Sequence, residues 1–195
     1  MIQGVLLTTI LSIIILAFYA IDFYFMSRYD RQRQGGKRGW KWKYVSMTML
    51  LGLVMLLQPV AWPSLGWSTD SPLGLLMQAA GGLLVVVAFA LHVWSRVHLR
   101  QFYVERVEVQ VDHQVIDTGP YALVRHPIIT SFFGLTGGLF LLNPAIPTLF
   151  VFIYTLWDFT QSAQKEEKLL SGNVTGYEAY IHRTPRFLPR LWRPR

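Results

Sequence analysis

The residues best suited to chemistry lie in two short segments, Arg125-His126-Pro127 and Glu166-Glu167. An arginine can donate two parallel hydrogen bonds to a carboxylate, and a histidine can donate or accept a proton near neutral pH. Because proline disfavours helical geometry in the residue before it, His126 is expected where a helix begins. Adjacent helical residues point about 100° apart, so the two glutamates are not expected to face the same ligand. We expect one glutamate to bind a ligand or pair with Arg125, and the other to face water or a different partner.

These residue types also occur for purely structural reasons. An arginine and a histidine often anchor a helix at a membrane interface, and glutamates between two lysines are typical of a solvated helix face. Asp22 and Asp158 lie near the ends of apolar runs, where we expect polar contacts at helix ends. His92 and His98 could approach one side of a helix end, but no carboxylate accompanies them in the pattern, so no metal site is predicted.

The composition is that of an integral membrane protein. The chain has 195 residues, of which 52% are hydrophobic and 15% are charged, whereas a soluble domain carries about 25% charged residues. Cysteine is absent, which excludes disulfides, thiolate metal sites and a cysteine nucleophile. No P-loop, metalloprotease or serine-hydrolase motif occurs, and no nucleic-acid partner is expected.

Three uncharged runs are long enough to cross a bilayer, which requires roughly 20 largely apolar residues. They are Ile2–Ile21, Tyr44–Thr69 and Ser71–Ser95. Each run predicts one spanning helix.

A fourth apolar region, residues 127–157, is interrupted by Asn143-Pro144 and then Pro147. Proline inside a helix removes a hydrogen bond and clashes with the preceding turn, so this segment predicts a turn between two arms, Ile128–Leu142 and Thr148–Ala163. The first arm would be about 22 Å long, which is short for a span. Whether it crosses the membrane completely is left open by the sequence.

The basic residues favour five spans over four. With five spans, all 18 lysines and arginines and both central glutamates fall on one side, which the positive-inside rule makes the cytoplasm. With four spans, the basic tail would lie outside. We therefore predict an all-α integral membrane protein with five transmembrane helices, a helical hairpin near the C-terminus, an outside N-terminus and a cytoplasmic C-terminus and pocket. The predicted cytoplasmic segments are Met26–Lys43, Arg96–His126 and the tail from Gln164.

Two further segments show local order. Val104–Val111 alternates apolar and polar residues, which is typical of a strand, and Asp117-Thr118-Gly119-Pro120 then predicts a turn.

An ordered set of motifs links the two chemical segments to the tail. The set consists of Thr118–Pro127 (TGPYALVRHP), Glu166-Glu167, Tyr177–Tyr180 (YEAY) and Arg183–Pro189 (RTPRFLP). It resembles the isoprenylcysteine carboxyl methyltransferase (ICMT) family, in particular prokaryotic, including archaeal, members, and that family in turn resembles the phospholipid methyltransferases. The resemblance covers about residues 91–192. This chain has Ile129 and Ser131 where many members have an aromatic residue and a glycine.

The resemblance implies methyl transfer from S-adenosylmethionine, with S-adenosylhomocysteine as the product. The acceptor would be a lipid-like or prenylated molecule entering from the bilayer, most simply the carboxylate of a prenylcysteine. We therefore divide the chain into a two-span N-terminal region, residues 1–70, and a methyltransferase core, residues 71–195. The implied catalytic residues are Arg125, Glu167 and Arg183. The implied cofactor-binding residues are His113, Val115, Gly119, Tyr121, Arg125, His126, Leu135, Glu166, Glu167 and Tyr180.

Two other functions fit part of the pattern. Membrane-bound sterol-type reductases resemble this family in their C-terminal half and use NADPH, and a membrane scaffold or small transporter would need no cofactor. The sequence determines neither the methyl acceptor nor the oligomeric state.

Overall fold

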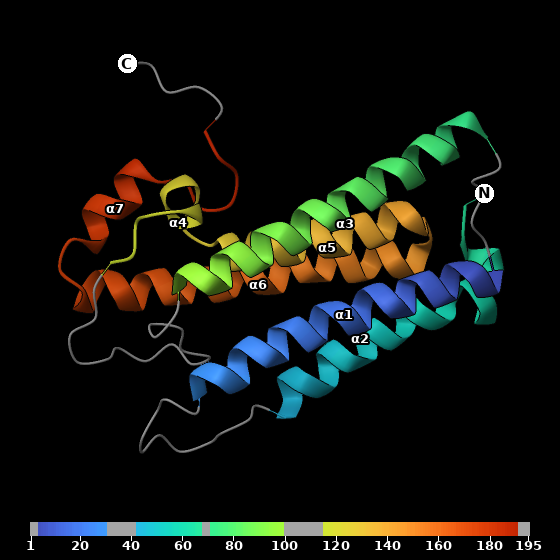
Figure 1. Ribbon diagram of the computed structural model, residues 1–195, viewed down its shortest axis with the longest axis horizontal. Coiled ribbons are helices and arrows are strands. Elements are labelled where there is room, and N and C mark those ends of the chain that lie inside the picture. Colours follow the sequence, from blue (N-terminus) through green and yellow to red (C-terminus); the bar gives the residue numbers. More distant parts are fainter. Residues whose placement is uncertain (1–3, 31–41, 68–70, 100–114, 191–195) are drawn as a thin grey trace.

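The structure is a computed structural model that describes residues 4–30, 42–67, 71–99 and 115–190. It is built from five long helices (Figure 1): α1 (Gly4–Asp30), α2 (Trp42–Ala61), α3 (Pro72–Leu99), α5 (Pro127–Leu142) and α6 (Ile146–Asn173). Three short helices join or follow them: η1 (Pro63–Leu65), α4 (Pro120–Leu123) and α7 (Tyr177–Arg183). No strand occurs in the described ranges, which confirms the predicted all-α class. The strand-like pattern at residues 104–111 lies outside these ranges.

The predicted apolar runs correspond to the long helices. The predicted hairpin is confirmed, because α5 ends at Leu142 and α6 begins at Ile146. The turn is stabilised by Thr148, whose hydroxyl donates to the carbonyl of Asn143 at 2.7 Å and accepts from the amide of Ala145 at 3.1 Å. Three helices run further than predicted: α1 continues to Asp30, α6 continues to Asn173, and α3 continues to Leu99, so Arg96 lies in the last turn of α3 rather than in a loop.

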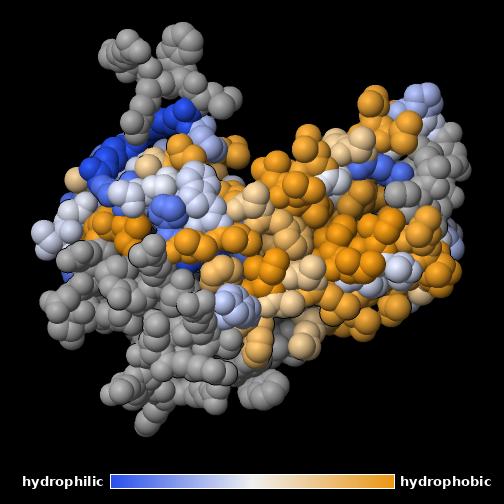
Figure 2. Space-filling view, viewed as in Figure 1, coloured by the Kyte–Doolittle hydropathy of each residue, from blue (hydrophilic) through white to orange (hydrophobic). Residues whose placement is uncertain are grey.

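Two of the helical segments are long and apolar enough to cross a membrane by length and composition, Gly4–Phe25 and Pro72–Leu99. Two shorter apolar helical segments are Gly52–Ala61 and Pro127–Leu142. The five-span arrangement and its orientation stay predictions. Apolar residues gather over the long helices, and hydrophilic residues gather at the end that carries α4 and α7 (Figure 2).

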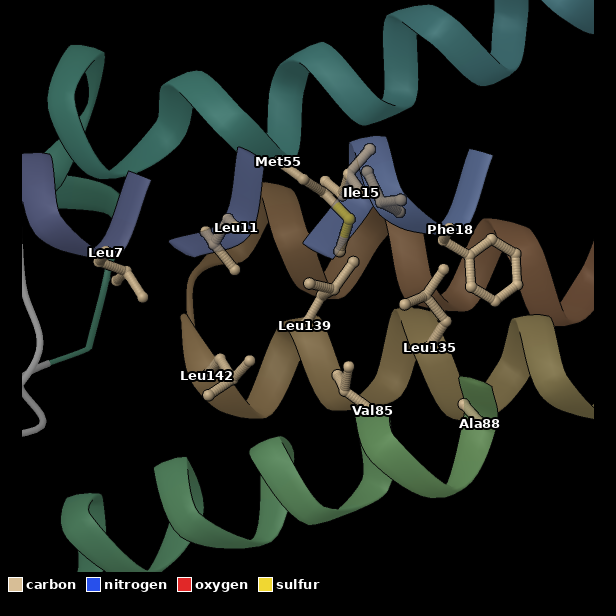
Figure 3. Close-up of a cluster of buried hydrophobic side chains, with 11 residues drawn as sticks. Leu7, Leu11, Ile15, Phe18, Met55, Val85, Ala88, Leu135, Leu139 and Leu142 are labelled. Carbon is tan, nitrogen blue, oxygen red and sulfur yellow. The ribbon is translucent and has the colours of Figure 1, made fainter. Parts of the chain in front are cut away.

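The long helices enclose one apolar core (Figure 3). Helices α1, α3 and α5 contribute residues spaced three or four apart, the spacing that lines one helix face, and α2 and α6 contribute one residue each. The α1 stripe is Leu7, Leu11, Ile15 and Phe18, all at most 6% exposed. It meets Met55 from α2, Val85 and Ala88 from α3, Leu135, Leu139 and Leu142 from α5, and Val151 from α6.

Helices α3 and α5 pack closely because glycines remove side chains from their interface. A Cβ atom added at Gly81 would lie 2.7 Å from the backbone oxygen of Gly138, and one added at Gly138 would lie 2.7 Å from Cγ2 of Val85. Both distances are below van der Waals contact, so neither position accepts a side chain without a backbone shift. Small residues are the usual means of close helix approach in membranes.

Polar side chains close the core at the end away from α7. The amide of Asn143 donates to Oε1 of Gln58 at 2.6 Å, and the amide of Gln58 donates to the carbonyl of Trp62 at 3.1 Å. Gln78 of α3 donates to the carbonyl of Leu142 at 3.3 Å. These bonds join α2, α3 and the turn between α5 and α6, where backbone groups would otherwise lack partners.

The glycine contact predicts a position-specific effect of alanine. Replacing Gly81 with alanine should destabilise the protein by about 1–3 kcal/mol, because the added methyl group overlaps the backbone of α5. Gly82, the next residue of the same helix, has no described atom within 4 Å of an added Cβ and is the matched control. Gly82→Ala should be neutral or stabilising by about 0.5–1 kcal/mol, since alanine is the better helix former. Thermal unfolding in detergent measures both, and equal melting temperatures for the two variants would contradict the packing argument.

Candidate active site

The Glu167 carboxylate is the centre of a charged cluster at the end of the bundle near α7. It accepts hydrogen bonds from Nε of Arg125 at 2.9 Å and Nε2 of His126 at 3.0 Å on the same oxygen. Arg186 donates from Nε to both oxygens at 3.1 Å and from Nη2 to Oε2 at 2.6 Å. Two arginines and a histidine therefore bind one carboxylate, and the Glu167 side chain is 8% exposed.

The members of this cluster come from three separate parts of the chain. Glu167 continues the buried stripe of α6 that includes Thr155 and Ala163. Arg125 and His126 directly precede α5, and His126 has the non-helical backbone that its following proline predicts, with φ −122° and ψ 63°. Arg186 belongs to the tail after α7.

Backbone hydrogen bonds hold the tail against the start of α5. The amide of Arg125 donates to the carbonyl of Pro185 at 2.8 Å, and the amide of His126 donates to the carbonyl of Arg186 at 3.1 Å. The hydroxyl of Thr130 donates to the carbonyl of Phe187 at 3.0 Å. The tail thus lies alongside the loop before α5 and the first turn of that helix.

Arg125 is largely occupied by protein groups. Besides its bond to Glu167, its Nη1 donates to the carbonyls of Ile181 at 2.8 Å and Thr184 at 2.5 Å. These carbonyls lie near the end of α7 and just after it, so the guanidinium joins α6, α7 and the loop before α5. Its side chain is only 9% exposed.

The three donors control the ionisation of Glu167. Burial alone would raise the pKa of this carboxyl group, but the hydrogen bonds from His126, Arg186 and Arg125 outweigh burial and hold the pKa below its ordinary value. The bond to Glu167 likewise raises the pKa of Arg186. The pair is therefore fully charged at neutral pH.

The second glutamate occupies a different position. The Glu166 side chain is 42% exposed, and its Oε2 lies 3.6 Å from Nδ1 of His126. His126 thus lies between the two carboxylates, with one ring nitrogen toward each. The prediction that the two glutamates have different surroundings is confirmed.

Aromatic residues pack beside the charged cluster. Tyr177 and Tyr180 are buried with Val174, and Val115 packs against them. The hydroxyl of Tyr180 donates to the carbonyl of Tyr121 at 2.7 Å, which joins α7 to α4. Burial, and then the carboxylates of Glu166 and Glu167, raise the pKa of Tyr177, and burial also raises the pKa of Tyr180. Both phenols are therefore neutral hydrogen-bonding groups.

Gly119 forms the predicted turn before α4. Its φ of 57° lies in the left-handed region, which favours glycine, and an added Cβ would lie 2.3 Å from the ring of His98. Nδ1 of His98 is buried without a hydrogen-bond partner among the described residues. The close approach of α3 to this turn therefore requires glycine at position 119.

Other predicted site residues lie apart from the cluster. Arg183 forms an exposed ion pair with Asp117 and lies over the ring of Tyr180, with its Cζ 5.8 Å from the ring centroid. Leu135 lies in the apolar core between the long helices rather than beside the tyrosines. His113 is outside the described residues.

Sequence reasoning missed the role of Arg186. Its motif, Arg183-Thr184-Pro185-Arg186, contains two arginines, and we expected the first one to contribute to the site. The structure places the second one on Glu167. Pro185 favours extended backbone at the preceding residue, Thr184, where α7 has ended. This proline is the local signal that the chain leaves the helix and returns toward Glu167.

The described residues thus form a helical protein with two helices long and apolar enough to cross a membrane and a buried, charged cluster at one end. The sequence model of the isoprenylcysteine carboxyl methyltransferase (ICMT) family matches residues 81–172, a little under half of the chain. The match confirms the resemblance read from the sequence.

A second comparison finds a relative that is similar over part of the chain. The nickel-cobalt-cadmium resistance protein NccN of Alcaligenes xylosoxydans xylosoxydans is 31% identical over 80 residues. The match covers 40% of this chain and 37% of that protein. The chain thus spans little more than a third of the relative it matches.

The Glu167 cluster predicts both a stability loss and a change in pH dependence. Glu167→Gln should cost about 3–5 kcal/mol, because the buried guanidinium of Arg125 loses its counter-charge. In the wild type the folded pKa is lowered, so this stabilisation is present above the unfolded value of about 4.3 and is lost as pH falls below it. The variant should therefore lose less stability than the wild type upon acidification.

Unfolding measured between about pH 7 and pH 3.5 tests this prediction, over the range that brackets the unfolded carboxyl pKa. Glu178→Gln is the matched control, because Glu178 is exposed on α7. It should keep the wild-type stability and pH slope. A wild-type slope in Glu167→Gln would contradict the assignment.

Proposed function

We propose that this protein transfers a methyl group from S-adenosylmethionine to a lipid-like acceptor in the membrane, with the carboxylate of a prenylcysteine-type molecule as the preferred class. The proposal rests on the family match and on one observation about the charged cluster. Its two inner members, Arg125 and Glu167, are nearly buried and bonded to each other and to neighbouring protein groups, while two more exposed residues beside them carry opposite charges. These are Arg186, 34% exposed, and Glu166, 42% exposed.

This outer pair has the chemistry needed to hold an amino acid. S-Adenosylmethionine ends in an α-ammonium and an α-carboxylate and supplies an electrophilic methyl group when bound. Arg186 would donate to the carboxylate, and Glu166 would accept from the ammonium. Both arginines already donate to Glu167, but Arg125 is only 9% exposed and also donates to two backbone carbonyls, so the more exposed Arg186 is better placed to contact a cofactor. We assign Arg125 to holding Glu167 and the tail in place.

The aromatic residues beside the cluster would hold the remainder of the cofactor. The neutral phenols of Tyr177 and Tyr180, with Tyr121 and Val115, form an apolar wall in which a nucleoside could pack. Aromatic faces also attract a positive sulfonium. Gly119 stays a proposed contributor on the family resemblance alone, because the ring of His98 fills the space beside it. His113 and Leu135 stay proposed contributors on the family resemblance alone.

Methyl transfer to a carboxylate needs no strong base, because the nucleophile is already ionised at neutral pH. The chain would contribute alignment of the two reactants and exclusion of water. Arg183, which is exposed on α7 over the ring of Tyr180, is our candidate for holding the acceptor carboxylate. If the acceptor were an amine, a proton would have to leave, and His126 between its two carboxylates would be the candidate base.

The site would face the cytoplasm, since the basic loops and tail predict that side. A sterol-type reductase is the alternative, and it requires NADPH binding. The name of NccN refers to metals, but the described residues contain no group of three or more histidine, cysteine, aspartate or glutamate side chains placed to hold one.

Calorimetry with S-adenosylhomocysteine in detergent tests the cofactor. The wild type should bind it, and Arg186→Ala and Glu166→Gln should each weaken binding about 10- to 100-fold, the effect of losing a charge-assisted hydrogen bond of roughly 1.5–3 kcal/mol. Arg190→Ala is the matched control, because Arg190 is exposed in the same tail. It should bind as the wild type does. NADPH binding without S-adenosylhomocysteine binding would favour the reductase.

Radiolabelled methyl transfer tests the acceptor. A prenylated cysteine with a free carboxylate should be methylated, and its carboxamide should not. Arg183→Ala should raise the KM for this acceptor while the affinity for S-adenosylhomocysteine stays within about twofold of wild type, since the arginine would touch only the acceptor. Methylation of the carboxamide, or of an aminolipid in preference to both, would overturn the carboxylate assignment.

A further inference from the structure

A second charged cluster lies inside the helix bundle. It consists of Asp22 from α1, His92 and Arg96 from α3, and Ser131 from α5. His92, Arg96 and Ser131 are at most 2% exposed, and the Asp22 side chain is 13% exposed. Ionisable residues within a membrane helix are costly, so their presence calls for a structural or functional reason.

The cluster joins three helices through polar contacts. Nε2 of His92 lies 2.9 Å from Oδ1 of Asp22, and Nδ1 of His92 lies 3.0 Å from Oγ of Ser131. Nη2 of Arg96 forms an ion pair with the same Asp22 oxygen. The imidazole therefore lies between α1 and α5, with one ring nitrogen toward each.

The cluster terminates the apolar core. Asp22 follows Phe18 on the buried stripe of α1, and His92 follows Ala88 on that of α3. Phe18 and Phe132 pack against the imidazole, with ring centroids 4.4 Å and 5.7 Å from it. The faces of α1 and α3 that form the apolar core thus continue into Asp22 and His92, two polar residues that contact each other.

The order Asp22, His92, Ser131 has the composition of a hydrolase triad, but its geometry does not support that chemistry. Ser131 is 0% exposed, and its hydroxyl donates to the carbonyl of Ile128 at 2.6 Å. A nucleophile must be reachable by its substrate, and this oxygen is enclosed by protein.

That last hydrogen bond connects the cluster to the candidate active site. Ile128 and Ser131 belong to the first turns of α5, directly after His126. In the same turns, the amide of Thr130 donates to the carbonyl of His126 at 2.9 Å, and its hydroxyl donates to the carbonyl of Phe187 in the tail. The start of α5 is thus held by the intramembrane cluster on one side and by the tail on the other.

We propose that Asp22, His92 and Ser131 are positioning residues for the methyltransferase site. Asp22 fixes the ring of His92, His92 fixes Ser131, and Ser131 fixes the turn that presents His126 to Glu167. Helix α1 would therefore contribute to the site although it lies outside the family-matched residues 81–172. The catalytic part of this inference rests on the proposed function, whereas the mechanical part does not.

Amide hydrogen exchange tests the mechanical part. Asp22→Asn should speed exchange at the amides of Arg125, His126 and Thr130, because their hydrogen bonds depend on the position of α5. Ser131→Ala removes only the hydroxyl link, leaves the Asp22–Arg96 ion pair intact, and should have the same effect without loosening α1. Thr9→Ala is the control, since Thr9 is exposed on α1 and its hydroxyl donates within that helix. It should leave these amides unchanged.

Kinetics tests the catalytic part. Ser131→Ala and Asp22→Asn should lower kcat about tenfold, which corresponds to roughly 1.4 kcal/mol, while KM for the acceptor stays within about twofold. Asp22→Glu, which keeps the charge, should restore part of the loss. Faster exchange confined to α1 and α3, with unchanged kcat, would overturn the proposal. If the wild type neither bound S-adenosylhomocysteine nor transferred methyl groups, the proposed function would fail, and the exchange data would still decide the mechanical link.

Discussion

A buried carboxylate must be paired, and in this protein the pairing of Glu167 determines how the C-terminal third of the chain is arranged. An ionised group taken out of water costs several kcal/mol unless opposite charges and hydrogen bonds replace its hydration. Glu167 lies on the inner stripe of α6, so its partners have to come to it. Arg125 reaches it from the loop before α5 and Arg186 from the tail. The backbone pairing between these two segments then follows from the same constraint.

The second buried carboxylate is arranged differently. Among the described residues, Asp22 contacts one arginine and one histidine of α3, and the rings of Phe18 and Phe132 pack against that histidine. That is a closed arrangement, suited to holding helices together. The Glu167 cluster also contains two more exposed charges of opposite sign, Arg186 and Glu166. The Asp22 cluster has no such exposed pair of charges among its described members. We therefore assign a structural role to the Asp22 cluster and propose ligand binding for the Glu167 cluster.

The sequence predicts the helices well because their signals are local. Runs free of charge, Pro72 at a helix start and Asn143-Pro144 between two arms act on the residues beside them, and the observed helices follow these signals. The partners of ionisable groups are not local. The sequence left open whether Arg125 pairs with a glutamate, assigned Arg96 to a loop, and gave no role to Arg186. In each case the partner comes from a distant part of the chain or from across a turn, and periodicity carries no information about such contacts.

The two clusters meet at the start of α5. The contacts made by its first turns explain how one short helix can be attached to both clusters. Glycines let α5 lie against α3 at backbone distance, so the position of α5 is set by rigid contacts rather than by flexible side chains. Ser131 and Thr130 are adjacent residues and point to different partners, one toward His92 and one toward the tail. A displacement of this turn would therefore disturb both clusters together. A helix held in this way can transmit the position of α1 to His126 without any contact between α1 and the ligand.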